Sequence, residues 1–360
     1  MVVKAGSLLV PGRGLISEPA LLVREGLIVG IYGPGAQSNH ELFGEKVIVH
    51  DYRDSVICPP FCDYHLHFPK AILPEADAIV SALLRSGITA VYEAGDRNMA
   101  GVEMKKAIGE RIEIRTSGYA IYKKGRYGGF IGKGVEDFSK ATREIDHLNS
   151  LGVDYLKLVT SGIFSPSSGT ITEGGFERQE IREIIAYASE KGLPAVCHAN
   201  GDRAIMDSAE AGAWGIVHGF YVTDETLSVM AEKQVRLIPT VSALLGLAVL
   251  SSRNEEKRRV EKLVDEHLAM IGRARDKGVR VLPGSDSGPQ FIPYGTSYLK
   301  ELALFRKAGF TEEEILSSAV VGPLKEGRWA DFLVLKGLSV EKTFINGALV
   351  SSVSSAGTSL

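Results

Sequence analysis

VICPPFCDYHLH, residues 56–67, is an apolar run that ends in two histidines one residue apart. The apolar part predicts a buried strand. Because side chains alternate between the two faces of a strand, Asp63, His65 and His67 share one face. Two imidazoles on one face can chelate a divalent ion. A lone His-x-His pair also arises by chance, so its meaning depends on the rest of the chain.

Short β-branched runs alternate with amphipathic stretches from about residue 55 to residue 320, which predicts a parallel sheet with crossover helices. Arg178–Lys191 is expected to be an outer helix, and Arg253–Lys277 a long helix or a pair of helices. Eight such units favour an α/β fold with a closed (β/α)8 TIM barrel. The eight runs are Val56–His67, Ile88–Gly95, Arg111–Ile121, Val153–Ser161, Pro194–Ala199, Gly215–Gly219, Val235–Thr240 and Val279–Asp286.

Both ends of the chain have the pattern of short strands and turns. Residues 1–54 contain turns at Pro11-Gly12 and Glu25-Gly26, and Asn346-Gly347 is a strong hairpin signal near the other end. Because neither end is long enough for a core of its own, we expect the two to pair in a small β-sandwich. The predicted domains are a β-sandwich of residues 1–54 and 325–350, a barrel of residues 55–324 and a disordered tail of residues 351–360.

Charge and composition exclude several classes of protein. The 41 basic residues nearly balance the 44 acidic ones, and no long basic cluster favours nucleic acid as a partner. The amino terminus lacks the pattern of a signal peptide, and no apolar stretch has the length of a membrane span. The three cysteines are an odd number in a large chain, which argues against a disulfide framework, and they are interpreted as small buried side chains. We therefore expect a cytoplasmic protein without a membrane partner.

Functional residues of a parallel barrel gather at the carboxyl ends of its strands. Six residues with metal-binding chemistry lie at or near these ends and are called the ligand cluster below: His65, His67, Lys157, His198, His218 and Asp286. Imidazoles with a carboxylate suit zinc and related divalent ions. Three of these residues, taken alone, could have a structural role in place of metal binding. Lys157 could extend its amine to solvent, and His198 and His218 could be core residues.

Lys157 lies between apolar neighbours, where burial lowers the pKa of its ammonium. The neutral amine can react with carbon dioxide to form a carbamate, which is an anionic bridge with two oxygens. We expect this N6-carboxylated lysine to bridge two divalent metal ions with a hydroxide between them.

These motifs resemble the amidohydrolase superfamily over nearly the whole chain. Residues 59–67 look like its first-strand motif and Tyr155–Leu158 like its carboxylated-lysine strand. Cys197–Ala199, Ile216–Gly219 and Pro283–Asp286 look like its later metal ligands, and Glu326–Asp331 like its return into the sandwich.

Residues 157–162 look most like the branch that contains metal-dependent Xaa-Pro dipeptidases and imidazolonepropionase-like proteins. This sequence departs from the pattern at Pro60, where the family has glycine, and in the short segment between Glu312 and Glu326.

The resemblance implies a hydrolase that cleaves a carbon–nitrogen bond. His65, His67 and Asp286 would hold the more buried ion, with zinc as the expected metal. His198 and His218 would hold the more exposed ion, and Lys157 would bridge the two. Asp286 would be the catalytic residue, taking a proton from the hydroxide and delivering one to the leaving nitrogen.

The expected substrate is a small molecule with a carboxylate, such as a dipeptide, an N-acyl amino acid or a cyclic amide. The basic segment, residues 117–137, contains Lys123, Lys124, Arg126 and Lys133 among several glycines. Arg126 is a candidate partner for the carboxylate because a guanidinium binds carboxylate in a bidentate way. Tyr122 and Tyr221 are further substrate-binding candidates. A solvated segment without a role in binding is the alternative.

Two other classes of function stay open. One is a mononuclear aminohydrolase, such as a deaminase, with an unmodified Lys157. The other is a metal-free binding protein on the same scaffold. The complete ligand set disfavours the binding protein, and the isolated strand lysine disfavours the deaminase. The sequence does not decide whether the protein is a homo-oligomer.

Overall fold

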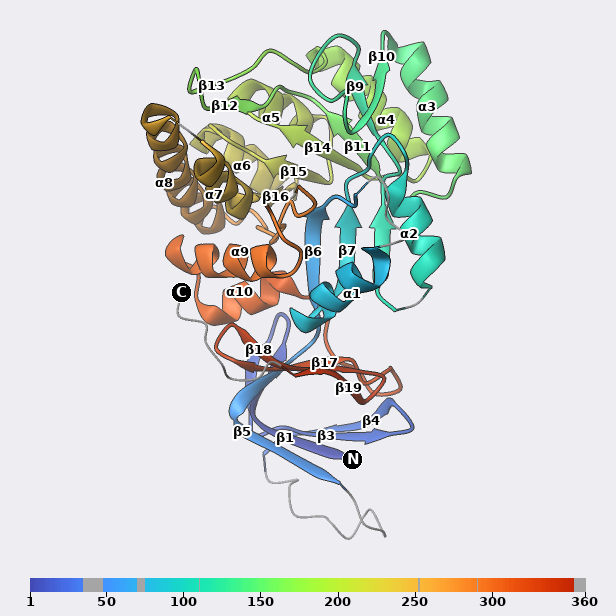
Figure 1. Cartoon of the computed structure of the whole chain (residues 1–360), viewed down its shortest axis with the longest axis vertical. Coiled ribbons are helices and arrows are strands. Elements are labelled where there is room, and N and C mark those ends of the chain that lie inside the picture. The colour runs from blue at the N-terminus through green and yellow to red at the C-terminus, as the bar shows by residue number, and fades with distance from the viewer. Residues whose placement is uncertain (35–47, 70–74, 110, 252, 290, 353–360) are drawn as a thin grey trace. The chain divides into compact units, whose positions relative to one another are not determined.

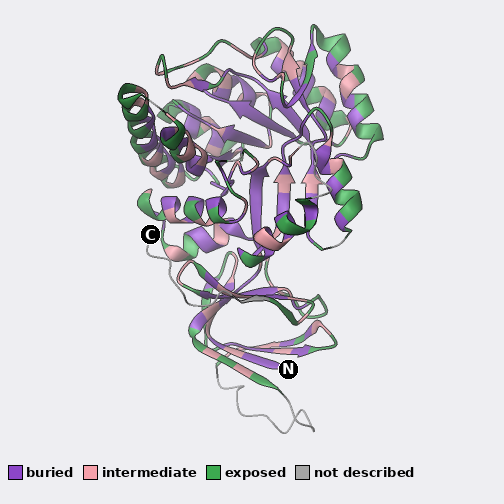
Figure 2. Cartoon of the chain, viewed as in Figure 1, coloured by how far each residue is buried: buried purple, intermediate pink, exposed green. Residues whose placement is uncertain are grey.

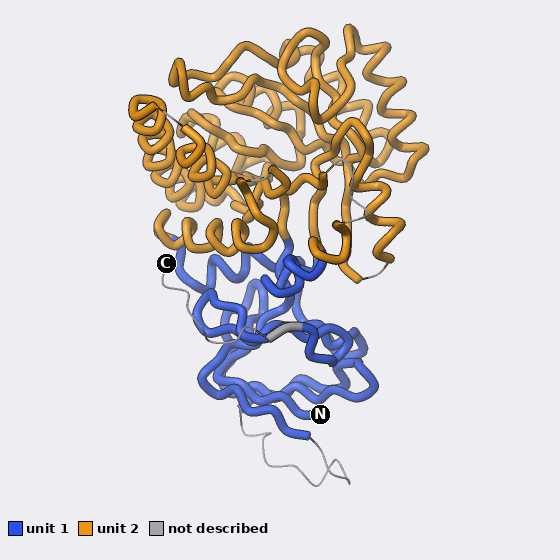
Figure 3. The backbone as a smooth tube through the Cα atoms, viewed as in Figure 1, with its two compact units in different colours: residues 1–62, 80–89, 310–360 blue, residues 63–79, 90–309 orange. Residues whose placement is uncertain are grey.

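The computed structural model describes residues 1–34, 48–69, 75–109, 111–251, 253–289 and 291–352 (Figure 1). It divides into two compact units (Figure 3). Unit 1 contains residues 1–62, 80–89 and 310–360, and unit 2 contains residues 63–79 and 90–309. The last eight residues of the predicted disordered tail, 353–360, lie outside the described residues.

Unit 1 contains strands from both ends of the chain in one sheet. Its order is β19-β18-β17-β5-β1-β3-β4, and β2 pairs with β1. The central strand β5 is parallel to β1 and antiparallel to β17, so it joins the amino-terminal strands to the carboxyl-terminal ones. The helix α10 (Glu312–Ala319) also belongs to this unit. The strands are β1 (Val2–Val10), β2 (Gly14–Ser17), β3 (Ala20–Arg24), β4 (Leu27–Tyr32), β5 (Val49–Cys58), β17 (Phe332–Lys336), β18 (Ser339–Ile345) and β19 (Ala348–Ser352).

Side chains from both ends form one apolar core in unit 1. Val3, Leu21 and Ile28 from the amino-terminal strands pack in the same cluster as Phe332 and Phe344. The predicted hairpin is present between β18 and β19, where Ile345 pairs with Ala348. Its two turn residues, Asn346 and Gly347, have φ values of 51° and 73°, as a two-residue hairpin turn requires. Strands from both ends of the chain therefore share one sheet and one core, while the β-sandwich domain of residues 1–54 and 325–350 stays a prediction.

The strands of unit 2 lie in a six-stranded sheet, a three-stranded sheet and a separate antiparallel pair, β12-β13. The six-stranded sheet has the order β10-β9-β11-β14-β15-β16, and each of its adjacent pairs is parallel. A second sheet has the order β6-β7-β8, with β6 and β7 entering from unit 1. The strands are β6 (Phe61–Leu66), β7 (Ile88–Glu93), β8 (Glu113–Thr116), β9 (Ala120–Lys123), β10 (Gly132–Val135), β11 (Leu156–Val159), β12 (Phe164–Ser165), β13 (Thr170–Ile171), β14 (Ala195–Ala199), β15 (Gly215–His218) and β16 (Arg236–Ile238).

Helices alternate with these strands. Strands β11 and β14 are buried along their whole length, while the helices expose one face (Figure 2). Parallel sheets whose two faces are covered by helices have this burial pattern. The helices are α1 (Ala76–Arg85), α2 (Ala100–Ile108), α3 (Phe138–Ser150), α4 (Arg178–Glu190), α5 (Asp202–Glu210), α6 (Asp224–Glu232), α7 (Val241–Leu250), α8 (Asn254–Asp276) and α9 (Thr296–Lys307). The predicted α/β class is confirmed, and the stretch 253–277 is one helix, α8. No helix among the described residues has both the length and the apolar character needed to cross a bilayer.

Two predicted strands differ from the structure. The run 111–121 is divided into β8 and β9, because Gly118 between them has a left-handed backbone with φ of 70°. In the run 279–286, only Val281 pairs with a neighbouring strand, through an isolated parallel bridge to Leu237. Over the described residues, unit 2 therefore has separate sheets and not one continuous hydrogen-bonded ring.

Candidate metal centre

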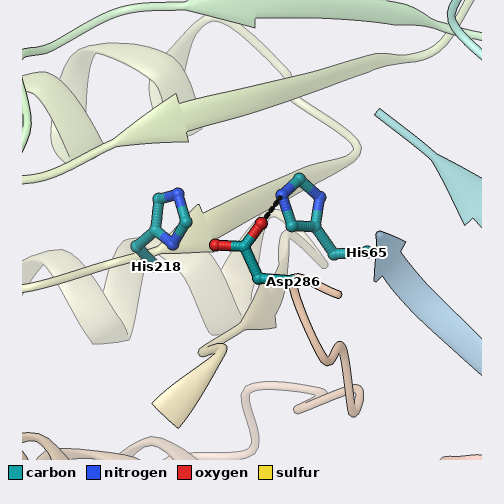
Figure 4. Close-up of side chains that lie close together, drawn as sticks. All are labelled: His65, His218 and Asp286. Carbon is teal, nitrogen blue, oxygen red and sulfur yellow. Dashed lines mark ion pairs between the residues drawn. The ribbon is translucent and has the colours of Figure 1, made fainter. Parts of the chain in front are cut away.

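The ligand cluster lies together in unit 2. His65 is on β6, His67 follows it, Lys157 is on β11, and His198 and His218 are on β14 and β15. The Nε2 atoms of His65 and His67 lie 3.4 Å and 3.6 Å from Oδ1 of Asp286. One ligand atom from each of His65, His218 and Asp286 lies within 4.8 Å of the others (Figure 4). The rings of His198 and His218 are 4.6 Å apart between centroids.

The strand register accounts for part of this arrangement. Lys157 is opposite Val196, so it shares a face with His198 two residues further along the neighbouring strand. His218 is opposite Ala199, which would place it on the other face of a regular sheet. However, His218 has a left-handed backbone with φ of 69°, which ends the pleat at this residue. The approach of His218 to His198 therefore depends on a break in the strand.

Three of the four histidines have one ring nitrogen already hydrogen-bonded. The Nδ1 atom of His67 donates to the carbonyl of Gly95 at 3.1 Å, and the Nε2 atom of His198 donates to the carbonyl of Gly162 at 3.1 Å. The Nδ1 atom of His218 lies 2.7 Å from the hydroxyl oxygen of Thr240. Such contacts fix the ring and leave its other nitrogen for a metal. The free atoms are Nε2 of His67, Nδ1 of His198 and Nε2 of His218.

Burial keeps these imidazoles neutral. His65 and His198 are only 2% and 3% exposed. Burial, with a smaller effect from the positive charge of Lys157, lowers the pKa of His198 to about 4. Burial also lowers the pKa of His65 and His218 well below the ordinary value, and lowers that of His67. Neutral imidazole is the form that binds a metal, so the four histidines of the ligand cluster are in the right protonation state near neutral pH.

A buried carboxylate supports the segment that contains Asp286. Asp63 accepts hydrogen bonds from the backbone N–H of Ser285 at 2.9 Å and from its hydroxyl at 2.5 Å. It also accepts one from the N–H of His65 at 3.2 Å. The N–H of Asp286 donates to the carbonyl of His65 at 2.7 Å. These bonds hold Asp286 beside His65, and burial raises the pKa of Asp63 to about 7 and also raises that of Asp286.

Lys157 is the most unusual member of the ligand cluster. Its side chain is 1% exposed, and its Nζ atom has no hydrogen-bond partner among the described residues. Burial lowers the pKa of this amine to about 8. Buried polar groups are nearly always hydrogen-bonded, so an unpartnered amine beside four imidazoles needs an explanation. Its position fits a group that is modified or that contacts a bound ion.

A cavity of about 290 Å³ opens above the ligand cluster. Apart from the cluster, most of its wall is apolar. Three polar side chains also line it: Tyr127, Asn200 and Thr240. The apolar lining residues are Phe130, Ile131, Ile163, Phe164, Phe220, Ala243, Leu244, Leu247, Pro289, Phe291 and Ile292.

The predicted substrate-binding residues lie elsewhere. Arg126 is half exposed, donates to Glu173 at 2.6 Å, and lines a second, polar hollow. Tyr122 lies on β9 against the small core of Ala120, Ile131 and Val159. The hydroxyl of Tyr221 donates to the carbonyl of Gly169 at 3.3 Å. None of these three is among the described residues that line the cavity above the ligand cluster.

The lysines of the basic segment are also paired with acids. Lys123 bonds to Glu180 at 2.5 Å, Lys133 lies 3.1 Å from Glu144, and Lys124 bonds to Glu136. The segment itself contains the two short parallel strands β9 and β10. Its positive charges are therefore largely compensated by acids of the protein.

Sequence reasoning did not identify Tyr127 or α7 as parts of the site. The ring of Tyr127 is 5.1 Å from that of His198, and burial raises the pKa of its phenol, so it stays protonated. The α7 stretch VSALLGLAVL has no charged residue. Even its exposed positions carry apolar side chains, those of Leu245, Val249 and Leu250. A helix that is apolar on all sides and only partly buried is a signal that sequence analysis could have used.

Comparison with known proteins identifies the family. The family model described as the amidohydrolase family matches residues 56–350. The chain therefore belongs to the amidohydrolase family, and the resemblance seen in its sequence is confirmed. Members of this family generally use divalent metals, in agreement with the His65, His218 and Asp286 group.

Solved structures of similar fold cover nearly the whole chain. A Xaa-Pro dipeptidase with methionine bound in its active site has a TM-score of 0.79 and 18% identity, covering 98% of this chain and 99% of its own. A putative prolidase from Bifidobacterium longum has a TM-score of 0.79 and 20% identity, over 97% and 94%. An ochratoxinase from A. niger has a TM-score of 0.78 and 19% identity, over 98% and 95%. At these identities the likeness is one of fold.

Curated relatives match a shorter stretch. Uncharacterized proteins of Mycobacterium bovis and Mycobacterium tuberculosis are 28% identical over 143 residues. This stretch is 39% of the present chain and 38% of each relative.

Proposed function

We propose that this protein is a metal-dependent hydrolase that cleaves the carbon–nitrogen bond of a small amide. The observation that carries the proposal is the amine of Lys157, which is buried without a hydrogen-bond partner among the described residues and lines the same cavity as the four neutral imidazoles and Asp286. Family membership supports the reaction class. The names of the structural neighbours, which include a Xaa-Pro dipeptidase and a prolidase, agree with it.

The donor set fits two divalent ions, with zinc as the first candidate. Nitrogen and carboxylate ligands suit zinc, and four imidazoles with Asp286 and a modified Lys157 exceed the needs of one tetrahedral ion. His65, His67 and Asp286 would hold one ion, and His198 and His218 the other. Ions bound there would lower the pKa of a water molecule and polarise the substrate carbonyl.

Lys157 would supply the bridge. Its neutral amine attacks carbon dioxide, a nitrogen–carbon bond forms, and one proton leaves, which gives an anionic carbamate. The lowered pKa of Lys157 supports this step, because more of the amine is neutral at pH 7 than in an exposed lysine. Nζ has no hydrogen-bond partner over the residues described, and Lys157 lines the cavity, so the amine is available to carry the added group.

Asp286 would move the proton. It takes one from the attacking water while the water oxygen bonds to the carbonyl carbon, and it gives one to the nitrogen as the carbon–nitrogen bond breaks. The products are a carboxylic acid and an amine. The Oδ1 atom of Asp286 lies 3.4 Å from Nε2 of His65 and 3.6 Å from Nε2 of His67, within the ligand cluster.

We also propose that the strands of unit 2 complete an eight-stranded barrel. Backbone hydrogen bonds near the ends of the two sheets support it, one set of them through the run 279–286. The N–H of Asp154 donates to Thr116 at 2.9 Å, that of Tyr64 to Pro283 at 3.0 Å, and that of Leu282 to Leu237 at 2.8 Å. These bonds lie at the two places where the sheets would have to meet.

The test is a metal count together with an amide screen. Protein purified without chelator should carry close to two divalent ions per chain and should release amine from N-acyl amino acids, dipeptides or cyclic amides. Removal of the metal should abolish turnover, and added zinc should restore it. One ion per chain in fully active protein would favour the deaminase alternative. Fully active protein without metal would exclude the mechanism.

A further inference from the structure

The cavity above the ligand cluster separates its polar and apolar groups. Its charged and metal-binding side chains are all members of the cluster at its base. Of the other polar lining groups, Asn200 uses its amide on Gly162 and Phe220, and Thr240 uses its hydroxyl on His218. Only the hydroxyl of Tyr127 lacks a side-chain or backbone partner among the described residues. A substrate would therefore meet one free hydroxyl and a wall of hydrocarbon.

The apolar wall extends from the base of the cavity to its mouth. Leu244 is buried, Leu247 is partly buried, and both come from α7. At the mouth, Phe130 is 60% exposed, and Ile163 and Phe291 are each 40% exposed. Large apolar side chains exposed around a cavity commonly mark a binding surface. Here they continue the wall that begins beside the metal ligands.

A charged substituent on this wall would be unfavourable. Burying an ionised group without a partner has a high free-energy cost, and the described wall residues offer no charged partner outside the ligand cluster. Binding of an apolar group there is favourable instead, because its surface is removed from water.

On the basis of the function proposed above, we propose that the substrate is an amide with a bulky neutral apolar group, aryl or branched alkyl, beside the scissile bond. Leu244, Leu247 and Phe291 would hold this group, with Phe130 and Ile163 at the entrance. Tyr127 would donate its hydroxyl to a polar atom of the substrate. A carboxylate, if the substrate has one, would lie outside this wall.

The experiment uses matched amides on metal-loaded protein. The acyl group is acetyl or phenylacetyl, and the amine is glycinamide or phenylalaninamide. Each is compared with its free-carboxylate counterpart. Burying one aryl group should raise kcat/KM at least about tenfold. If the amides are hydrolysed at equal rates whatever the size of the apolar group, the proposal is wrong although the hydrolase function holds.

Two leucines of α7 provide a matched pair of variants. Leu247 lines the cavity, while Leu245 is exposed and does not. Leu247→Asp should lower the preference for phenylacetyl over acetyl amides at least about tenfold, and Leu245→Asp should not change it. Leu247→Ala, a milder change, should lower the preference in the same direction. An equal loss in Leu245→Asp would show a general effect on α7 and would count against the proposal.

A binding measurement separates this proposal from the proposed function. Calorimetry with metal-free protein and phenylacetyl-phenylalaninamide should show binding with a negative heat-capacity change, weakened in Leu247→Asp. If no amide is hydrolysed but this binding is present, the hydrolase function fails and the apolar site stands. If the wild-type protein binds the acetyl and phenylacetyl compounds equally, the apolar site is excluded.

Discussion

The ligand cluster and the basic segment, residues 117–137, both gather charged or titratable side chains in unit 2, yet they differ in how these groups are satisfied. In the ligand cluster, Lys157 is buried without a hydrogen-bond partner in the described chain, and three of the four imidazoles use one ring nitrogen in a polar contact and leave the other for a metal. In the basic segment, Arg126 and the lysines are paired with acids of the protein. Groups left unpaired inside a protein are more informative about function than charges that are already compensated.

The largest effect is expected from Lys157→Ala. Loss of the bridge should lower the metal content. It should also reduce kcat by at least about 10⁴-fold, because the catalytic groups act as a unit and the loss of one removes most of their joint effect. Added short-chain carboxylic acids should restore part of the activity by filling the same space. The measurements are kcat and metal per chain by elemental analysis.

Lys157→Arg is the matched control, because arginine keeps the charge but its guanidinium does not form the carbamate. It should be as inactive as the alanine variant. Full metal occupancy and full kcat in either variant would show that Lys157 has only a structural role. The ligand cluster would then no longer differ from the basic segment by an unpaired lysine with a function.

Asp286→Asn tests the acid–base role. The amide can still coordinate weakly but cannot transfer a proton, so most of the metal should stay while kcat falls by about 10²–10⁴-fold. Near wild-type turnover would exclude Asp286 from proton transfer. A parallel fall in metal content would instead assign it to metal binding alone.

Thr240→Val tests the contact that orients His218. Valine keeps the shape of threonine but removes the hydroxyl 2.7 Å from Nδ1 of His218. Loss of such a contact should weaken metal affinity by about 10–100-fold, which titration with a competing chelator can measure. Thr226→Val is the control, because Thr226 is equally buried but bonds to Asp202. An equal loss of affinity in both variants would indicate a general effect on folding.

The smallest effect is expected from Arg126→Ala. Arg126 is half exposed and paired with Glu173, and exposed ion pairs contribute little. KM for carboxylate-bearing amides should change by less than about threefold, in line with the weak effect of a compensated surface charge. A rise of KM limited to these substrates would show that Arg126 does bind the carboxylate, as the sequence suggested. Lys124→Ala, on the same segment, is the comparison.

The α/β class could be predicted from the sequence by itself, and it is confirmed. The sequence also indicated that strands from both chain ends and the six residues of the ligand cluster would come together, as they do in the structure, while the metal-binding role of the six stays a prediction. These features depend on local patterns: period-two alternation places His65 and His67 on one face, and parallel strands carry their carboxyl ends to the same edge. Gly118 was harder to interpret. Its left-handed backbone divides a run that looks like one strand, and many glycines in this chain have no such effect.

Tertiary structure alone decided the rest. The approach of His218 to His198 depends on a left-handed backbone at His218, which no local pattern requires of a histidine. The apolar wall is assembled from α7, the basic segment and the loop at Phe291, which are far apart along the chain. The pairing of Arg126 with Glu173 joins residues 47 positions apart. Side-chain type is a local property, but whether a charge is compensated or left free depends on which distant residues the fold brings beside it.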